Sequence, residues 1–245
     1  MTDIFEGISS KGWKAGWEPG REIFLGYEGE VEKIEQKYPK RISADAPKAQ
    51  GRQLCTVFYG ASNFRMWKNL DKDLAQFGAQ NHGFGGATDV LLMHYAERIL
   101  FPYSPDIVVV QSGSNDYMGL SGSLQEKAET SLALKKHMYR YFAENLPDAR
   151  FVALGALLMP GFAQATELSL LINEELRGFC EEMNLSSEKA GEKPRFVYAD
   201  LSGLTRSGSD AYRTELFKSD GIHLNRDGQL ELCGQYIRPA LEKFF

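Results

Sequence analysis

The sequence predicts an α/β protein with a flavodoxin-like, doubly wound sheet of five parallel strands and helices on both faces. From Leu54 onward, short apolar runs that end in Gly, Ser or Asn alternate with longer segments of helical periodicity. The chain has 245 residues, 43% of them hydrophobic, which is enough for the core of one domain. Ligands bind outside the carboxyl ends of the strands in such sheets, so we expect the functional residues at that edge.

Each predicted element follows from its residue pattern. Short segments rich in β-forming residues predict the strands, at Leu54–Tyr59, Ala79–His82, Ile107–Gln111, Arg150–Leu158 and Phe196–Ala199. Longer segments of helical period predict the helices, at Arg65–Phe77, Thr88–Leu100, Ser123–Leu146, Gln164–Asn184 and Arg226–Lys243. Thr88 is suited to cap the helix that Pro102 stops, and Ser123 and Pro147 bracket the next one.

Residues 1–50 do not follow this alternation. Gly12–Gly20 is rich in Gly and Trp, and Tyr27–Lys37 has the pattern of one polar helix that ends at Pro39. Trp13 and Trp17 would be costly to leave in water. We therefore expect residues 1–50 to form an extension that packs on a domain made by residues 51–245.

Composition argues against several classes of protein. A formal net charge of −5 leaves no general basic surface for nucleic acid. Cys55, Cys180 and Cys233 are widely separated and form no Cys-x-x-Cys pair, which argues against a disulfide framework or a zinc site. The first residues lack the pattern of a signal peptide, and no segment has the ~18 apolar residues of a membrane span. The expected location is the cytoplasm.

Ser62 is the candidate nucleophile. It follows the first strand, and the small residues Gly60 and Ala61 permit a sharp turn that presents its hydroxyl beside the start of a helix. The alternative is an ordinary serine cap.

Two further loops could donate hydrogen bonds to a developing oxyanion. The turn after the second strand contains Gly83, Gly85 and Gly86, and a glycine N–H there can approach closely, whereas Asn115 follows the third strand with a side-chain amide. A tight turn and an Asx turn are the respective alternatives. His82, beside the first of these loops, is interpreted as structural.

Asp220 and His223 are the most specific pair. A serine becomes a nucleophile when a neutral imidazole takes its proton, and a carboxylate on the other ring nitrogen fixes the tautomer. A spacing of three residues lets one turn bring the two side chains together just before the last helix. The alternatives are a surface Asp with a nearby His, and a two-ligand metal site that no further His or Cys cluster would complete.

Taken in order, four blocks resemble those of the SGNH/GDSL hydrolase superfamily. They read Gly60-Ala61-Ser62-Asn63, Asn81-x-Gly83-x-Gly85-Gly86, Gly113-x-Asn115-Asp116 and Asp220-x-x-His223. The first block, continued by Phe64-Arg65-x-Trp67, is most similar to the GDSL-like lipase/acylhydrolases, in which it reads Gly-Ser-Ser-[Ser]-[Ile/Phe]-Arg-x-Trp. The resemblance runs from about Tyr27 to the C-terminus and implies the SGNH hydrolase fold.

The resemblance implies Ser62 as nucleophile, His223 as general base and then acid, and Asp220 as the carboxylate that orients it. It implies an oxyanion hole made by the backbone N–H groups of Ser62 and Gly86 and the side chain of Asn115. No metal or organic cofactor is required.

Ala61 departs from the family, which has Asp or Ser at this position, so the hydrogen bonding around the turn is expected to differ. Arg65 and Trp67 are expected to brace the loop by packing, with a pocket role for Arg65 as the alternative.

The expected reaction is hydrolysis of a small acyl ester, above all an acetyl ester of a carbohydrate or another small alcohol. The superfamily that the chain resembles also contains lysophospholipases and platelet-activating-factor-type acetylhydrolases, so these lipid esterases are alternatives. An O-acyltransferase with the same residues is another, and a binding module that has lost turnover is the non-enzymatic one. The sequence leaves the oligomeric state open.

Overall fold

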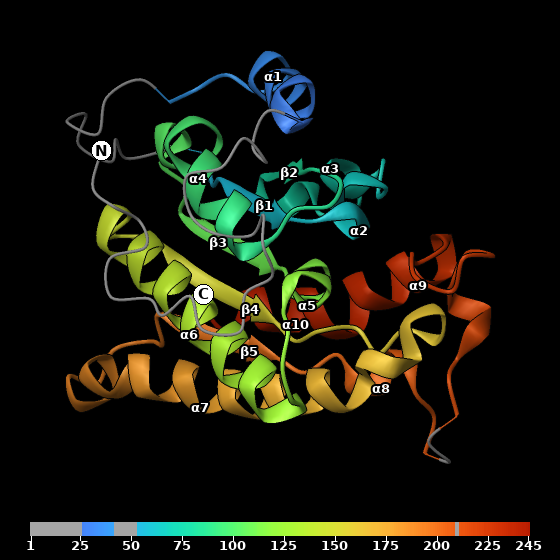
Figure 1. Ribbon diagram of the computed structural model, residues 1–245. Coiled ribbons are helices and arrows are strands. Elements are labelled where there is room, and N and C mark those ends of the chain that lie inside the picture. Colours follow the sequence, from blue (N-terminus) through green and yellow to red (C-terminus); the bar gives the residue numbers. More distant parts are fainter. Residues whose placement is uncertain (1–25, 42–52, 209–210) are drawn as a thin grey trace.

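The computed structural model describes residues 26–41, 53–208 and 211–245, which form a five-stranded parallel sheet between helices (Figure 1). The strands are β1 (Thr56–Gly60), β2 (Ala79–Gly83), β3 (Ile107–Gln111), β4 (Arg150–Leu154) and β5 (Phe196–Ala199). Their order is β2-β1-β3-β4-β5, the flavodoxin-like arrangement. The predicted fold class is confirmed, although β4 ends four residues before the predicted Leu158.

The register aligns the carboxyl ends of the central strands. Gly60, the last residue of β1, is opposite Gly83 of β2 on one side and Gln111 of β3 on the other. The three loops that follow these strands therefore start from one edge of the sheet.

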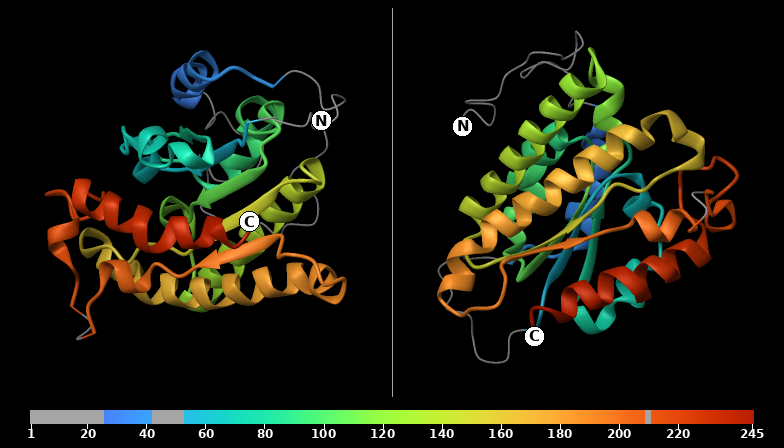
Figure 2. Two further views of the ribbon diagram at one scale, coloured as in Figure 1. Left: turned by 180° about the vertical axis from the view of Figure 1, so that it is seen from behind. Right: turned by 90° about the horizontal axis from the view of Figure 1, so that it is seen from below.

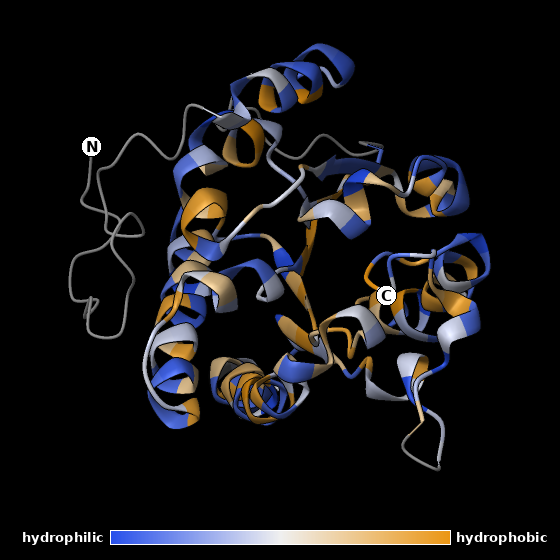
Figure 3. Ribbon diagram, turned by 45° about the vertical axis from the view of Figure 1, so that its right-hand side comes forward, coloured by the Kyte–Doolittle hydropathy of each residue, from blue (hydrophilic) through white to orange (hydrophobic). Residues whose placement is uncertain are grey.

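Helices cover both faces of the sheet, as the right-hand view of Figure 2 shows for α6 and α7 on one side and α10 on the other. Along β3, Val108 and Val110 pack in one core cluster, whereas Ile107 and Val109 pack in the other. Hydrophobic residues gather on the strands and on the helix sides that face them (Figure 3). The face of Val108 and Val110 carries α4 (Asp89–Ile99), α6 (Leu124–Asn145) and α7 (Thr166–Lys189). The face of Ile107 and Val109 carries α2 (Ser62–Arg65), α3 (Leu70–Asp73), α9 (Arg226–Glu231) and α10 (Arg238–Glu242). Short connecting helices are α5 (Ser114–Gly119), α8 (Ser202–Thr205), η3 (Phe101–Tyr103), η4 (Pro160–Ala165) and η5 (Thr214–Leu216).

The two predicted helix caps are present. The Thr88 hydroxyl accepts a hydrogen bond from the Leu91 N–H, and Ser123 forms a reciprocal capping box with Glu126. α6 ends two residues before Pro147, which cannot continue the helix hydrogen-bonding pattern.

The predicted single helix Arg65–Phe77 is wrong. The chain instead forms α2, α3 and the 3₁₀ turn η2 (Ala75–Phe77). The Asn81 side-chain amide, from the next strand, donates to the carbonyl oxygens of Phe64 and Trp67. It occupies carbonyls that a continuous helix would use, so a tertiary contact overrides the local periodicity.

The last helical segment contains a π-helical stretch, η6 (Leu232–Ile237), between α9 and α10. Pro239 lies just beyond it and has no N–H to offer the carbonyl four residues earlier, with which its ring would also clash. Widening the preceding turn relieves that conflict, so helical structure continues through the proline.

α1 (Glu28–Lys37) is the described part of the predicted extension, and it packs on α4. Val31 and Ile34 are buried, and Arg98 of α4 pairs with Glu28 and Glu35. Trp13, Trp17 and the predicted boundary at residue 50 lie outside the described residues.

Two composition-based expectations concern covalent links and membranes. Cys55, Cys180 and Cys233 are all buried and form no disulfide with one another. Among the helices of the described ranges, none combines the length and apolar composition that a bilayer span requires.

Candidate active site

Ser62 lies at the carboxyl end of β1, where the chain turns into α2. The turn needs glycine at position 60, because a Cβ there would lie 2.2 Å from the Gln111 carbonyl oxygen. Ala61 adopts an extended conformation and donates its N–H to that same oxygen at 3.2 Å. Ser62 is the first residue of α2, so its own N–H has no intrahelical acceptor.

Asp220, His223 and Ser62 form a continuous chain of hydrogen bonds. The Asp220 Oδ2 atom lies 2.7 Å from His223 Nδ1, and His223 Nε2 lies 2.8 Å from Ser62 Oγ. Asp220 Oδ1 also accepts the backbone N–H groups of Ile222 and His223, at 2.8 and 2.9 Å. The three-residue spacing thus closes into one compact turn, in which Gly221 takes a φ of +66°.

The Asp220 carboxylate is held in its charged form. Partial burial raises its pKa, but the hydrogen bonds from His223 and Ile222 outweigh this effect and lower the pKa to about 2. An ionised carboxylate favours the tautomer of His223 that carries its proton on Nδ1. Nε2 is then an acceptor that faces the Ser62 hydroxyl.

Two residues fix the loop of Asp220 and His223 and were not singled out by sequence. The Asn63 side chain accepts the Leu224 N–H at 3.0 Å, so the neighbour of Ser62 holds the neighbour of His223. Gly161 donates its N–H to the Gly221 carbonyl at 2.8 Å, and a Cβ there would lie 2.3 Å from the Asp220 carbonyl oxygen. Asn63 stood in the first of the four blocks without an assigned role, and the signal for Gly161 was only a glycine beside Pro160 after the fourth strand.

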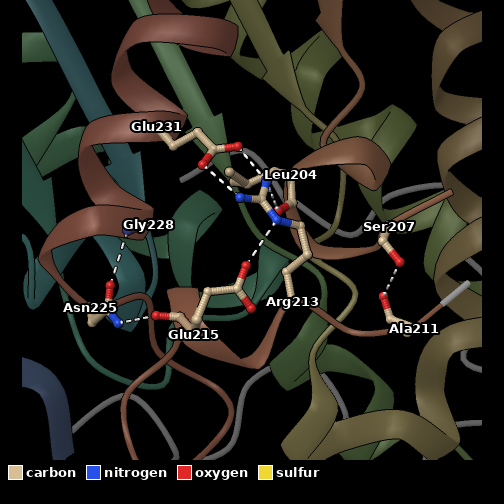
Figure 4. A network of polar contacts seen from close by, with 8 residues as sticks. All are labelled: Leu204, Ser207, Ala211, Arg213, Glu215, Asn225, Gly228 and Glu231. Atoms are coloured by element: carbon tan, nitrogen blue, oxygen red, sulfur yellow. Dashed lines mark hydrogen bonds and ion pairs between the residues drawn. The ribbon is translucent and has the colours of Figure 1, made fainter. Parts of the chain in front are cut away.

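A polar network joins the chain that precedes this loop to α9 (Figure 4). The Arg213 guanidinium contacts the carboxylates of Glu215 and Glu231 and the Leu204 carbonyl. The Asn225 side chain donates to the Glu215 carbonyl and accepts the Gly228 N–H at the start of α9. Both flanks of the loop are therefore fixed by several hydrogen bonds.

The predicted oxyanion-hole residues lie on adjacent loops. The Asn115 side-chain amide donates one hydrogen bond to the Ala87 carbonyl at 2.9 Å, which links it to the residue after Gly86. The amide has a second hydrogen available. Gly86 has a φ of +74°, which favours glycine, and a Cβ there would lie 3.0 Å from the Tyr27 hydroxyl oxygen.

A small cavity opens beside Ser62, with a volume of about 40 Å³. Its lining includes Ala61, Ser62, Gln111, Ser112, Asn115 and Met159. The cavity can therefore hold at least one water-sized group. Gly86 is outside the lining, so of the predicted oxyanion donors only Ser62 and Asn115 border this space.

A buried ion pair lies behind the cavity. Lys135 of α6 is 3% exposed, and its ammonium donates to both oxygens of the fully buried Asp89, at 3.0 and 2.9 Å. It also donates to the Ser112 hydroxyl at 2.9 Å. Asp116 accepts the Asp89 N–H at 2.9 Å and so caps α4. Burial, and then the Asp89 charge, raise the pKa of Asp116 well above its usual range, which favours its protonated form.

His82, Arg65 and Trp67 have structural contacts. His82 is fully buried, and its Nδ1 lies 2.6 Å from the Ile99 carbonyl oxygen, so the structural interpretation fits. Arg65 pairs with Glu30 of α1, whose other carboxylate oxygen accepts the Gly85 N–H. Trp67 is buried and donates its indole N–H to Asp73. Arg65 is not among the residues that line the cavity.

Metal ligands do not gather in the part of the chain that the structure describes. There, no three His, Cys, Asp or Glu side chains are placed to hold a metal ion.

Comparisons with solved structures agree on the fold. A protein from Bacteroides fragilis assigned as an acylhydrolase superposes with a TM-score of 0.64, at 18% identity over 92% of this chain and 99% of that one. A GDSL-like lipase from Bacteroides thetaiotaomicron gives a TM-score of 0.58, at 16% identity over 91% and 98%. A carbohydrate esterase of family 3 from Talaromyces cellulolyticus gives 0.55, at 14% identity over 78% and 97%.

A search among curated proteins found no match. The model of the GDSL-like lipase/acylhydrolase family matches residues 24–230, which span α1 and all five strands. The chain therefore belongs to the GDSL-like lipase/acylhydrolase family.

Proposed function

We propose that this protein is a serine esterase in which Ser62 is the nucleophile, His223 the general base and Asp220 the residue that orients His223. The observation that carries the proposal is the hydrogen-bond chain from Asp220 Oδ2 through both ring nitrogens of His223 to Ser62 Oγ, at 2.7 and 2.8 Å. This is the arrangement in which a neutral imidazole can take the serine proton.

The proposed reaction has two acyl-transfer steps. Ser62 Oγ attacks the ester carbonyl as its proton passes to His223 Nε2, and the alcohol then leaves with that proton. Water, deprotonated by His223, attacks the acyl-enzyme and releases the acid and free Ser62. The positive charge that forms on His223 in each step is stabilised by ionised Asp220.

The oxyanion of each tetrahedral intermediate would receive hydrogen bonds from the Ser62 N–H, the Asn115 amide and the Gly86 N–H. Support comes from the Ser62 N–H at the start of α2 and from the second hydrogen of the Asn115 amide. A donor of this kind contributes about 3–4 kcal/mol to transition-state stabilisation.

We further propose a short acyl group, above all acetyl, on a carbohydrate or another small alcohol. The cavity beside Ser62 is small, about 40 Å³, which supports a small acyl group. The carbohydrate is supported by likeness to the Talaromyces enzyme, and the acetyl group by likeness to a solved acetyl esterase that is 14% identical.

The test is hydrolysis of p-nitrophenyl acetate, butyrate and octanoate by the wild-type protein and by Ser62→Ala and His223→Ala variants. Ser187→Ala is the matched control, because Ser187 lies near the far end of α7. We expect turnover in the wild type and the control, fastest on acetate, and loss of nearly all turnover in the two variants.

Three other outcomes would contradict parts of the proposal. Turnover that survives both substitutions would reject the assigned residues. A preference for octanoate would favour a lipid esterase, such as a relative of the solved Streptococcus protein titled a platelet activating factor. Acyl product that accumulates on an added alcohol instead of water would favour an O-acyltransferase.

A further inference from the structure

The lining of the cavity beside Ser62 includes a polar residue, Gln111, whose side chain has no hydrogen-bond partner among the described residues. Gln111, at the end of β3, is 7% exposed, and it shares a strand face with the core residues Ile107 and Val109. Within residues 26–41, 53–208 and 211–245, no group forms a hydrogen bond with its side-chain amide. The amide is nevertheless not sealed from solvent. Gln111 is one of the residues that line the cavity, and we infer that its amide can reach this space.

Ser112, the next residue in the wall, has a hydroxyl whose hydrogen is available. The Lys135 ammonium is a donor only, so the Ser112 oxygen accepts from it at 2.9 Å. The two remaining Lys135 hydrogens go to Asp89, so this ammonium holds the Ser112 oxygen in place. The Ser112 O–H must therefore donate elsewhere, and no group of the described chain accepts it. Because Ser112 lines the cavity, we infer that its O–H can donate into this space.

A purely apolar acyl group would leave these groups unpaired. A buried donor without a partner weakens binding by about one to two powers of ten. A site built to hydrogen-bond a substrate oxygen rejects the analogue that lacks it far more strongly than it rejects a change of one methylene. The small volume of the cavity, about 40 Å³, favours a short acyl group.

We propose that, among short acyl groups, the cavity prefers over plain acetyl a two-carbon group with an oxygen on its α carbon, such as hydroxyacetyl, and that Gln111 and Ser112 are its specificity-determining residues. Ser112 donates to the α oxygen, and the Gln111 amide accepts the hydroxyl hydrogen or donates to the same oxygen. This inference rests on the proposed function, because the acyl group must reach Ser62.

The test compares phenyl hydroxyacetate with phenyl propionate, which have nearly the same size and differ by one hydroxyl in place of one methyl group. Each kcat/KM is divided by the rate constant for hydroxide-catalysed hydrolysis of the same ester, which removes the intrinsic activation by the α oxygen. We expect the wild type to favour hydroxyacetate by about tenfold or more.

The variants Gln111→Leu and Ser112→Ala should each lower this ratio by about tenfold, whereas Met159→Leu in the apolar wall should change both rates in parallel and keep the ratio. Ser112→Ala removes a single oxygen atom, so it keeps the test valid if Gln111→Leu does not fold. Equal rates on the two esters in the wild type, or a ratio that survives both polar substitutions, would overturn the inference.

Failure of the proposed function gives a different result. If no ester is turned over faster by the wild type than by Ser62→Ala, the esterase proposal fails. The preference of the cavity can then be tested without turnover. Ligand-observed NMR measures the binding of free hydroxyacetate and of free propionate to the wild type and to Gln111→Leu. Tighter binding of hydroxyacetate that Gln111→Leu removes supports the inference, and equal binding rejects it.

Discussion

The Asn63 side chain accepts a hydrogen bond from the Leu224 N–H at 3.0 Å, and this contact joins the loop of Ser62 to the loop of His223. The two loops are 161 residues apart in the chain, so their alignment depends on such tertiary contacts. The distance between Ser62 Oγ and His223 Nε2 is therefore controlled in part by a residue outside the proposed triad.

Replacing Asn63 by Ala should lower kcat more than it changes KM. Without the acceptor, the two loops can separate, and a displacement of about 1 Å in a reacting group can cost on the order of 10²-fold in rate. Asn63→Asp keeps an acceptor oxygen and should recover part of the loss. Steady-state kinetics on p-nitrophenyl acetate measure the effect; a kcat for Asn63→Ala within twofold of the wild type would show that the contact does not control the alignment.

Replacing Asp220 by Asn should lower kcat by roughly three to four orders of magnitude, because an amide no longer selects the tautomer with the proton on Nδ1. Asp227→Asn, in the first turn of α9, is the matched control and should keep kcat close to that of the wild type. Because the pKa of Asp220 is about 2, its charge persists as the pH falls, and we expect no loss of activity through protonation of Asp220 above about pH 4. The pH profile of kcat/KM checks this statement. An ionisation above pH 4 that is present in the wild type and absent in Asp220→Asn would contradict it.

His82 should make the folded protein less stable in mild acid. Burial lowers its pKa to about 4, against about 6.5 in the unfolded chain. Between these values the unfolded chain binds a proton that the folded protein does not, so the free energy of unfolding falls as the pH drops from about 6.5 to about 4. The loss should reach about 3 kcal/mol, at about 1.4 kcal/mol per pKa unit.

Urea unfolding at pH 7 and pH 4.5 measures this loss, with His82→Asn as the comparison. Asn can donate to the Ile99 carbonyl from the position of Nδ1 but does not take up a proton. The variant should therefore lose less stability than the wild type between the two pH values. Parallel losses in both proteins would assign the acid sensitivity to other groups.

Replacing Lys135 by Met should cost about 3–5 kcal/mol of stability, because the substitution leaves the fully buried Asp89 carboxylate without a counter-charge. The double variant Lys135→Met with Asp89→Asn removes both charges and should recover much of the loss. Urea unfolding compares the three proteins at pH 7. A double variant that is no more stable than Lys135→Met would show that the ion pair itself is not the source of the effect.

The sheet could be predicted from sequence because its strands are short apolar runs separated by clear helical periods. The contact between Asp220 and His223 was also predictable, since both side chains come from one local turn. The division of Arg65–Phe77 was not predictable from periodicity, because the Asn81 amide that takes its carbonyls comes from the next strand. The role of Gly161 depends in the same way on a contact across the fold, and a lone glycine in the sequence does not reveal it.

The contacts of Glu30 in α1 affect how short a fragment of this protein can be made. One of its oxygens accepts the Gly85 N–H and the other pairs with Arg65, so a helix that precedes the sheet supports the loops on either side of β2. A fragment that starts after residue 50 would keep every strand together with Ser62, Asp220 and His223. It would nevertheless lose the acceptor for Gly85 and the counter-charge for Arg65. The shortest piece that preserves these loops is therefore longer than the shortest piece that contains the sheet.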